Sequence, residues 1–201
     1  MSTATAHVIP LDPTKRTSTL PVDPLFLDRW SPRALSPEPI SERDVQTLFE
    51  AARWAPSASN QQPWMFLFAD DEAGRARVRS TLAEFNQQWA NTAPLLVVLM
   101  ARKTNDKGEA NDWAGFDSGA AWMSFALQAR KLGLYAHAMG GFDEEKVYEV
   151  LQVDRTQWAP MAVIAVGRHG NPATLPPKLQ AREKPNERKP LEEIVRRIAG
   201  T

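Results

Sequence analysis

Apolar residues recur at helical spacing in the first third of the chain. Four of them between Val45 and Ala52 stand at i, i+3, i+4 and i+7, which predicts a helix with one buried stripe. Ser41 precedes this helix and Asp44 follows three residues later, a pattern similar to a capping box. Pro56 ends the helix, because proline cannot donate the next backbone hydrogen bond.

Two more helices are predicted from apolar stripes. A long central helix that ends at Gly133 is marked by Phe116, Ala120, Met123 and Leu127. A terminal helix is marked by Leu191, Ile194, Val195 and Ile198. A proline-rich segment leads into the terminal helix, which indicates docking against a distant surface such as a partner subunit.

Four short apolar runs predict β-strands. They cover residues 64–69, 94–101, 134–139 and 161–167. The strand at 64–69 is expected to be buried. Shorter helices are predicted over residues 24–29, 71–82, 84–90 and 143–151. Since strands and helices alternate, the expected class is α/β or α+β. Residues 1–23 are expected to form a flexible arm, followed by a single domain over residues 24–201 with a C-terminal extension from about residue 168.

Charge and composition exclude several kinds of partner. The 24 basic and 24 acidic side chains balance in 201 residues, so no overall field attracts nucleic acid or an anionic membrane. No apolar run approaches the length of a membrane span, and the absence of cysteine removes disulfides and thiolate chemistry. The three histidines lack metal-ligand spacing. We therefore expect a cytoplasmic protein in which any bound anion is held by a local group of cations.

Arg29, Ser31 and Arg33 are candidates for such a group. Pro32 disfavours a helical conformation at Ser31, so the segment is expected to be extended, with the three side chains on one side. Two guanidinium groups and a hydroxyl suit a phosphate, which arginine holds through paired hydrogen bonds. A solvated charged surface fits the same residues, and the local pattern leaves both interpretations open.

The stretch from Ala55 to Trp64 is a second candidate. Its polar residues lie between a helix end and a strand, which leaves backbone amides and the Asn60 side chain free to face a ligand. Such a side chain can pair with the edge of a heteroaromatic ring. A helix stop followed by an Asx-type turn explains the same residues equally well. The loop alone therefore does not distinguish a ligand-binding loop from a structural turn.

Taken in order, these motifs resemble those of the nitroreductase family. RWAPSASNQQPW at residues 53–64 is similar to the family signature, in which a helix end with an arginine is followed by APS, a variable pair, N and QPW. RWSPR at residues 29–33 resembles the family's N-terminal basic motif. GLYAHAMGGF at 133–142 and RKPLEE at 188–193 resemble its glycine turn and its terminal arginine. Together the matches extend from residue 29 to about residue 196.

The resemblance implies an α+β fold with a mostly antiparallel central sheet flanked by helices, in an intertwined homodimer that binds FMN at its interface. It implies that the phosphate is held by Arg29, Ser31, Arg33 and Arg188, with Trp30 in the same motif. The other subunit would present Pro56, Ser57, Ala58 and Asn60 to the flavin ring.

The resemblance also implies further contacts with the flavin ring, among them the glycine turn near its reactive nitrogen. Gly140 and Gly141 would give the backbone close access to it, and Asn86 would contact it. Trp89 stands where some family members have a lysine, so this chain must stabilise the charge of the reduced flavin in another way.

The implied activity is a ping-pong reaction in which NADH or NADPH is a transient reductant and a small planar electron acceptor follows. Nitroaromatics, quinones and activated alkenes are candidate acceptors, and residues 102–116 are expected to cover the open face of the flavin. An enone or dehalogenating reductase built on the same site is one alternative, and a flavin-binding protein without turnover is another. No catalytic side chain is implied, because the flavin carries the chemistry.

Overall fold

The computed structural model describes residues 16–200, so most of the predicted N-terminal arm lies outside the described residues. Its centre is one four-stranded sheet in the order β1-β2-β4-β3, with every neighbouring pair antiparallel. The strands are β1 (Trp64–Ala69), β2 (Leu95–Arg102), β3 (Tyr135–Met139) and β4 (Trp158–Gly167). The predicted α+β class with an antiparallel sheet is confirmed.

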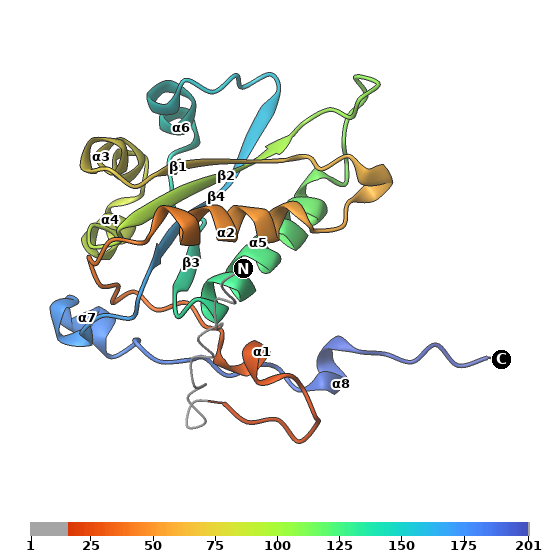
Figure 1. Cartoon of the computed structure of the whole chain (residues 1–201). Helices are drawn as coiled ribbons and strands as arrows, with labels where there is room; N and C mark the ends of the chain where they lie inside the picture. Colours follow the sequence, from red (N-terminus) through yellow and green to blue (C-terminus); the bar gives the residue numbers. More distant parts are fainter. Residues whose placement is uncertain (1–15, 201) are drawn as a thin grey trace, which may run out of the picture.

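Helices cover both faces of this sheet (Figure 1). The α-helices are α1 (Pro24–Asp28), α2 (Glu42–Arg53), α3 (Glu72–Ser80), α4 (Glu84–Ala90), α5 (Ala114–Lys131), α6 (Glu144–Leu151), α7 (Pro177–Gln180) and α8 (Leu191–Ile194). Two 3-10 turns are η1 (Ala58–Asn60) and η2 (Pro172–Thr174). One face packs against α2 and α5, and the other packs against α3, α4 and α6. The result is a three-layer domain with two cores.

Strand β2 separates the two cores. Leu95, Val97 and Leu99 point into one of them, while Leu96 and Val98 point into the other. Successive side chains of a strand alternate between the two faces, so a central strand covered on both sides must be apolar throughout. This requirement explains the continuous apolar run from which the strand was predicted. In contrast, β1 lies at the sheet edge, and only Ala69 of it is buried, so its prediction as a buried strand was wrong.

The predicted stripe of α5 faces the wrong way. Phe116 is 75% exposed and Met123 is 37% exposed, whereas Ala121, Phe125 and Ala129 are buried against the sheet. Alanines let this helix lie close to the strands and Phe125 fills the core between them, whereas Phe116 and Met123 are left on the opposite face. That face is an unpaired apolar surface within one chain.

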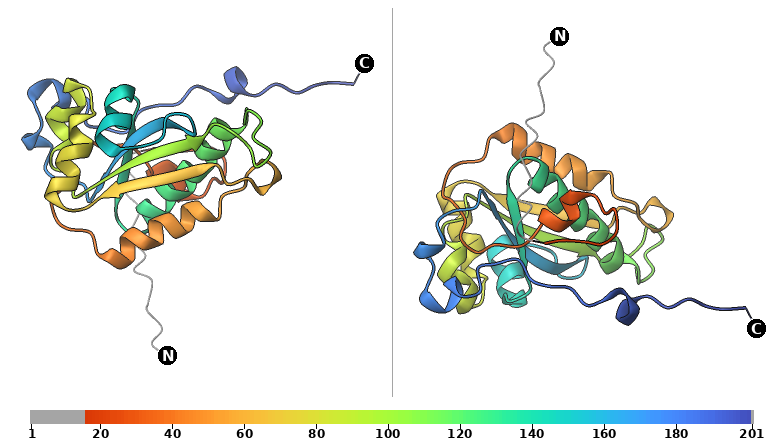
Figure 2. Two further views of the ribbon diagram at one scale, coloured as in Figure 1. Left: turned by 90° about the horizontal axis from the view of Figure 1, so that it is seen from above. Right: turned by 90° about the horizontal axis from the view of Figure 1, so that it is seen from below.

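The predicted terminal helix is much shorter than its stripe. Only α8 forms, as a single turn, and Leu191, Ile194, Val195 and Ile198 are all exposed. Figures 1 and 2 show this segment running away from the body of the domain. A single isolated turn has little intrinsic stability, so this segment needs a surface beyond its own chain to be fixed in place.

A buried ion pair joins the start of the chain to α5. Asp28, the last residue of α1, accepts a hydrogen bond from Arg130 Nε, and both side chains are buried. The guanidinium also lies 4.5 Å from the centre of the Tyr135 ring. The contact fixes α1, and therefore the segment that begins at Arg29, against the C-terminal end of α5.

Candidate functional site

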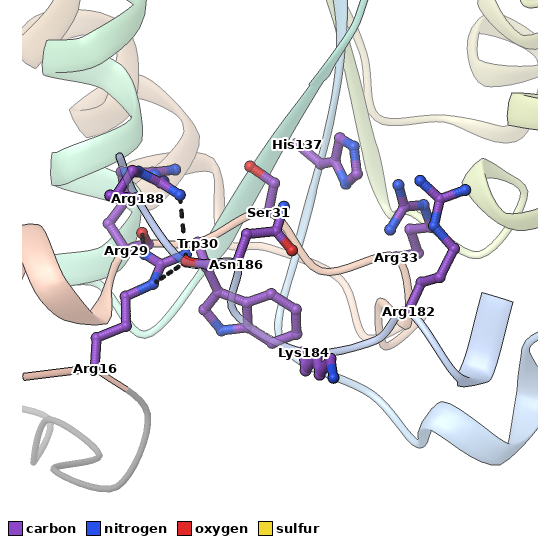
Figure 3. Close-up of a pocket in the computed structure, with 10 residues that line it drawn as sticks. All are labelled: Arg16, Arg29, Trp30, Ser31, Arg33, His137, Arg182, Lys184, Asn186 and Arg188. Atoms are coloured by element: carbon purple, nitrogen blue, oxygen red, sulfur yellow. Dashed lines mark hydrogen bonds between the residues drawn. The ribbon is translucent and has the colours of Figure 1, made fainter. Parts of the chain in front are cut away.

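A small polar pocket of about 130 Å³ lies where the segment after α1, the strand β3 and the chain after α7 meet (Figure 3). It is lined by Arg16, Arg29, Trp30, Ser31, Arg33, His137, Arg182, Lys184, Asn186 and Arg188. Six of these ten residues are cationic. The structure therefore brings together four of the predicted phosphate residues, namely Arg29, Ser31, Arg33 and Arg188.

The arginines form two groups in the pocket (Figure 3). Arg16, Arg29 and Arg188 lie at one end, and Arg33 lies with Arg182 at the other. Arg16 stabilises the first group, because its Nη1 donates to the carbonyl of Arg29 at 3.0 Å and its Nε donates to the carbonyl of Asn186 at 3.0 Å. One side chain therefore joins the N-terminal segment to the C-terminal tail.

The electrostatics of this pocket favour a bound anion. Burial lowers the pKa of Arg29, and the nearby charges of Arg16 and Arg188 lower it further. Burial and the charge of Arg182 likewise lower the pKa of Arg33. In addition, Arg33 Nε is buried with no hydrogen-bond partner among the residues that the structure describes. Half-buried cations that repel one another are stabilised by an anion between them, and the free Nε is a donor for it.

Three of the cations were not found from the sequence. Arg16 stands in the presumed flexible arm, and Arg182 and Lys184 stand in a tail without periodicity. The available signal was the excess of lysine and arginine between residues 178 and 189 in a chain with no net charge. That excess does not say which of the basic side chains face inward.

Trp30 contributes to the pocket mainly by packing. Its indole is buried and meets the rings of Tyr135 and His169 edge-on, with centroid distances of 6.0 and 5.4 Å. The buried ring anchors the extended segment, so Arg29 and Ser31 on either side of it are held at the pocket wall.

His137 lies on the pocket wall at the middle of β3. Its Nδ1 is 2.9 Å from the carbonyl oxygen of Pro32, and its ring lies 4.6 Å from that of Trp89. Since a carbonyl only accepts, Nδ1 carries the proton in this contact. Burial lowers the pKa of His137 to about 4, despite the hydrogen bond to Pro32. The side chain is therefore neutral near pH 7 and adds no further positive charge to the pocket.

The half-buried His137, with its lowered pKa, predicts a loss of stability in mild acid. Between pH 6.5 and about 4 the unfolded chain binds a proton at this histidine and the folded chain does not. The contribution of the neutral histidine to the free energy of unfolding is thus complete above pH 6.5. It is lost as the pH falls towards 4, and over this range the free energy of unfolding decreases by up to about 1.4 kcal/mol per pH unit. Denaturant unfolding of flavin-free protein across this range measures the slope. His137→Asn keeps a donor towards Pro32 without a titrating ring, and an unchanged slope in this variant would contradict the assignment.

The loop at residues 56–62 has an unusual backbone. Ser59, Asn60 and Gln62 have positive φ angles of 51°, 55° and 47°, and these are three of the four non-glycine residues with positive φ in the described chain. Such conformations cost free energy and concentrate at functional sites. The loop is fixed by Asp117 of α5, whose Oδ2 accepts from the Ala58 N–H at 3.1 Å.

This loop and the cationic pocket lie at opposite ends of α5. Asp117 holds the loop near the start of the helix, while Arg130 holds α1 near its end. Thirteen residues at 1.5 Å each separate these two positions by about 20 Å. The candidate residues Pro56, Ser57, Ala58 and Asn60 are therefore not part of the pocket that their own chain forms.

Asn86 is buried and holds the glycine turn. Its Nδ2 donates to the carbonyl of Gly141 at 2.9 Å, and the Ala83 N–H donates to the same oxygen at 3.0 Å. Asn86 is thus not an exposed residue at a helix end. Trp89, one turn further along α4, is 1% exposed and belongs to the core.

The two glycines of the turn are expected to respond differently to alanine. A Cβ on Gly141 would lie 2.7 Å from Asn86 Nδ2, whereas a Cβ on Gly140 meets nothing within 4 Å. Gly141→Ala should displace Asn86 and lower the free energy of unfolding of flavin-free protein by about 1–2 kcal/mol, the cost of a lost hydrogen bond at a buried amide. Gly140→Ala is the matched control and should unfold like the wild type in a denaturant titration. Equal stabilities for the two variants would disprove this role of Asn86.

Two absences hold for the part of the chain between residues 16 and 200. No cluster of His, Asp or Glu there could hold a metal ion. None of its helices is long and apolar enough to cross a bilayer.

The fold and the pocket define an α+β protein with a pocket lined by cations. The model of the nitroreductase family matches two overlapping segments of it, residues 27–87 and 78–168. The chain belongs to the nitroreductase family, and the predicted family is confirmed.

Two relatives illustrate the similarity in sequence. A provisionally named NADH dehydrogenase/NAD(P)H nitroreductase of Streptomyces coelicolor is 29% identical over 175 residues, which cover 77% of this chain and 88% of that protein. YdgI of Bacillus subtilis, provisionally named an NAD(P)H nitroreductase, is 26% identical over 165 residues, covering 64% of this chain and 78% of the relative.

Solved structures agree with this fold. The crystal structure of an oxidoreductase containing FMN is 39% identical, with a TM-score of 0.86 over 92% of this chain and 97% of the other. The enone reductase CLA-ER is 20% identical, with a TM-score of 0.72 over 87% and 96% of the two chains. At that identity the second similarity shows the fold alone.

Proposed function

We propose that this chain binds FMN and uses NADH or NADPH to reduce small planar electrophiles. The observation that carries the proposal is the pocket of six cations with the unpartnered, buried Arg33 Nε. A cofactor that ends in a phosphate fits this donor set. Similarity to an FMN-containing oxidoreductase at 39% identity supports FMN as the particular cofactor. The lack of cysteine suits a reducing compartment such as the cytoplasm.

The phosphate is assigned to the end of the pocket where Arg29 and Arg188 converge with Arg16. Ser31 offers a hydroxyl between the two groups of arginines. Arg33, at the other end, would then donate to a second electronegative part of the same cofactor, since arginine pairs well with planar acceptors. This assignment refines the simpler expectation that all the predicted arginines contact the phosphate.

The second wall of the site is proposed to come from another copy of the chain. The strained loop at 56–62 is separated from its own pocket by most of the length of α5, which supports assigning the contact with the cofactor to a partner's loop. The exposed Phe116 and Met123 on α5 and the exposed tail after Arg188 offer the apolar surface for such a homodimer. The loop residues named above would then approach the ring from the partner subunit.

The turn at Gly140 and Gly141 is proposed to pass close to the flavin ring. Gly140 is exposed and has open space where a side chain would stand, so a flat ligand can approach its backbone. Asn86 acts on this turn through its hydrogen bond to Gly141, and we assign it the role of fixing the turn's position.

Bound FMN would supply the redox chemistry, taking two electrons from NAD(P)H and passing them to an acceptor in a second half-reaction. The protein's part is to hold the phosphate, orient the ring and leave one face open. Nitroaromatics and quinones are the proposed acceptors. Residues 102–116, where Trp113 and Phe116 are exposed, are the segment proposed to select among them.

The proposal is tested by mixing purified, flavin-loaded protein with NADH or NADPH without oxygen. Bleaching of the yellow flavin, followed by recovery of colour on adding a nitroaromatic or a quinone, is the expected result. Recovery only with an activated alkene would favour an enone reductase. Failure to bleach with either nucleotide would favour a flavin-binding protein without turnover.

A further inference from the structure

Glu183 is an acidic side chain at the edge of a cationic pocket. It follows α7, and its carboxylate is 1% exposed. The carboxylate accepts hydrogen bonds from the backbone N–H of Arg33 at 2.9 and 3.0 Å and from that of Ala34 at 2.8 Å. Burial alone would raise the pKa of Glu183, but a hydrogen bond from His169 and these backbone donors lower it overall.

The segment that Glu183 contacts is also held by backbone hydrogen bonds to residues 168–170. The Ala34 carbonyl accepts from the Gly170 N–H at 2.7 Å, and the Ser36 N–H donates to the Arg168 carbonyl at 2.9 Å. Gly170 has no room for a side chain, because a Cβ there would lie 2.9 Å from the backbone of Leu35. The extended segment is thus fixed to the start of the tail independently of Glu183.

Beyond residue 170 the tail carries half of the pocket's cations. Arg182 and Lys184 are the immediate neighbours of Glu183 in the sequence, and Arg188 lies further along the same tail. Arg16 ties the far part of this tail to Arg29, and the hydrogen bonds of Glu183 to Arg33 and Ala34 hold its nearer part, with Arg182 and Lys184, against the same segment.

We propose that Glu183 is a positioning residue that assembles the cationic pocket by joining the tail to the Arg33–Ala34 backbone. The proposal rests on the function proposed above, in that the anion to be held is the FMN phosphate. Glu183 acts through the arginines and needs no contact with the cofactor itself.

The charge of Glu183 and its hydrogen bonds predict opposite effects of its replacement on FMN affinity. A carboxylate beside a phosphate site repels the phosphate, so on charge alone its neutralisation should strengthen FMN binding. If Glu183 assembles the pocket, its loss leaves the N–H groups of Arg33 and Ala34 without their acceptor, loosens this part of the tail and weakens FMN binding. The sign of the change therefore separates the two explanations.

The experiment compares wild type, Glu183→Ala and Glu183→Asp by titrating flavin-free protein with FMN and with riboflavin, which lacks the phosphate. Both variants should bind FMN about tenfold more weakly or worse, as expected for the loss of hydrogen bonds to a charged group, with little change for riboflavin. Glu183→Asp keeps the charge and shortens the reach, so it tests geometry alone. Glu187→Gln is the matched control, since it removes an exposed tail carboxylate near Arg16 and should not weaken FMN binding.

Hydrogen exchange at the Arg33 and Ala34 amides gives a readout that does not depend on flavin. Both amides should exchange faster in the two Glu183 variants than in wild type. Unchanged exchange, or FMN binding as tight as in wild type, would overturn the proposal. If wild-type protein binds no FMN while the amides still respond to Glu183, the proposed function fails and the joining role of Glu183 stands.

Discussion

Replacing Asp28 by alanine is expected to destabilise the folded protein by about 3–5 kcal/mol, because it leaves the guanidinium of Arg130 buried without its counter-ion. Both side chains are buried where α1 meets α5. Oδ1 of Asp28 and Nη1 of Arg130, the atoms beside the hydrogen-bonded ones, have no hydrogen-bond partner among the described residues. Denaturant unfolding measures the change directly.

The matched control removes both charges together. Replacing Asp28 by leucine and Arg130 by methionine leaves no unpaired charge, and such exchanges of a buried pair for apolar residues are often neutral or stabilising. The double variant should therefore recover most of the stability that Asp28→Ala loses. A double variant as unstable as the single one would show that shape, and not the unpaired charge, determines stability at this position.

Removing Arg29 and Arg188 together is expected to abolish most of the preference for a phosphorylated flavin. Each hydrogen bond to a charged group contributes about 1.5–3 kcal/mol, so the double alanine variant should lose at least about 100-fold in affinity for FMN. Fluorescence titration of flavin-free protein with FMN measures this loss.

Two controls make the result specific to the phosphate. Riboflavin affinity should change little in the Arg29→Ala/Arg188→Ala variant, since riboflavin has no phosphate to lose. Arg43→Ala removes an exposed positive charge of α2 that does not line the pocket, and it should leave FMN affinity as in wild type. An equal loss for FMN and riboflavin would mean that the two arginines act on folding and not on the phosphate.

Local pattern predicted most of the elements correctly. Helix α2 begins after Ser41, whose side chain accepts from the Asp44 N–H, and it ends before Pro56 as expected. Strand β2 was recognisable because both of its faces are buried and it must be apolar throughout. The candidate group of Arg29, Ser31 and Arg33 was also readable, since proline and the alternation of an extended segment are local rules.

The features that could not be predicted from the sequence depend on contacts between residues far apart in the chain. Glu183 meets Arg33 across 150 residues, and no local rule marks a tail glutamate as an acceptor for a distant backbone. The apolar stripe of α5 did not mark its buried face, because alanines and Phe125 pack against the sheet while Phe116 and Met123 face outward. The stripe after Leu191 overestimated the terminal helix, because a stripe predicts a helix only where a surface exists to bury it.

The most direct test of the central claim, that the six-cation pocket holds the phosphate of a flavin, is the relative affinity of wild-type protein for FMN and riboflavin. Flavin-free protein titrated with each should bind FMN at least about 100-fold more tightly, because several charge-assisted hydrogen bonds reach the phosphate alone. Equal affinity for the two flavins, or binding of neither, would contradict the account.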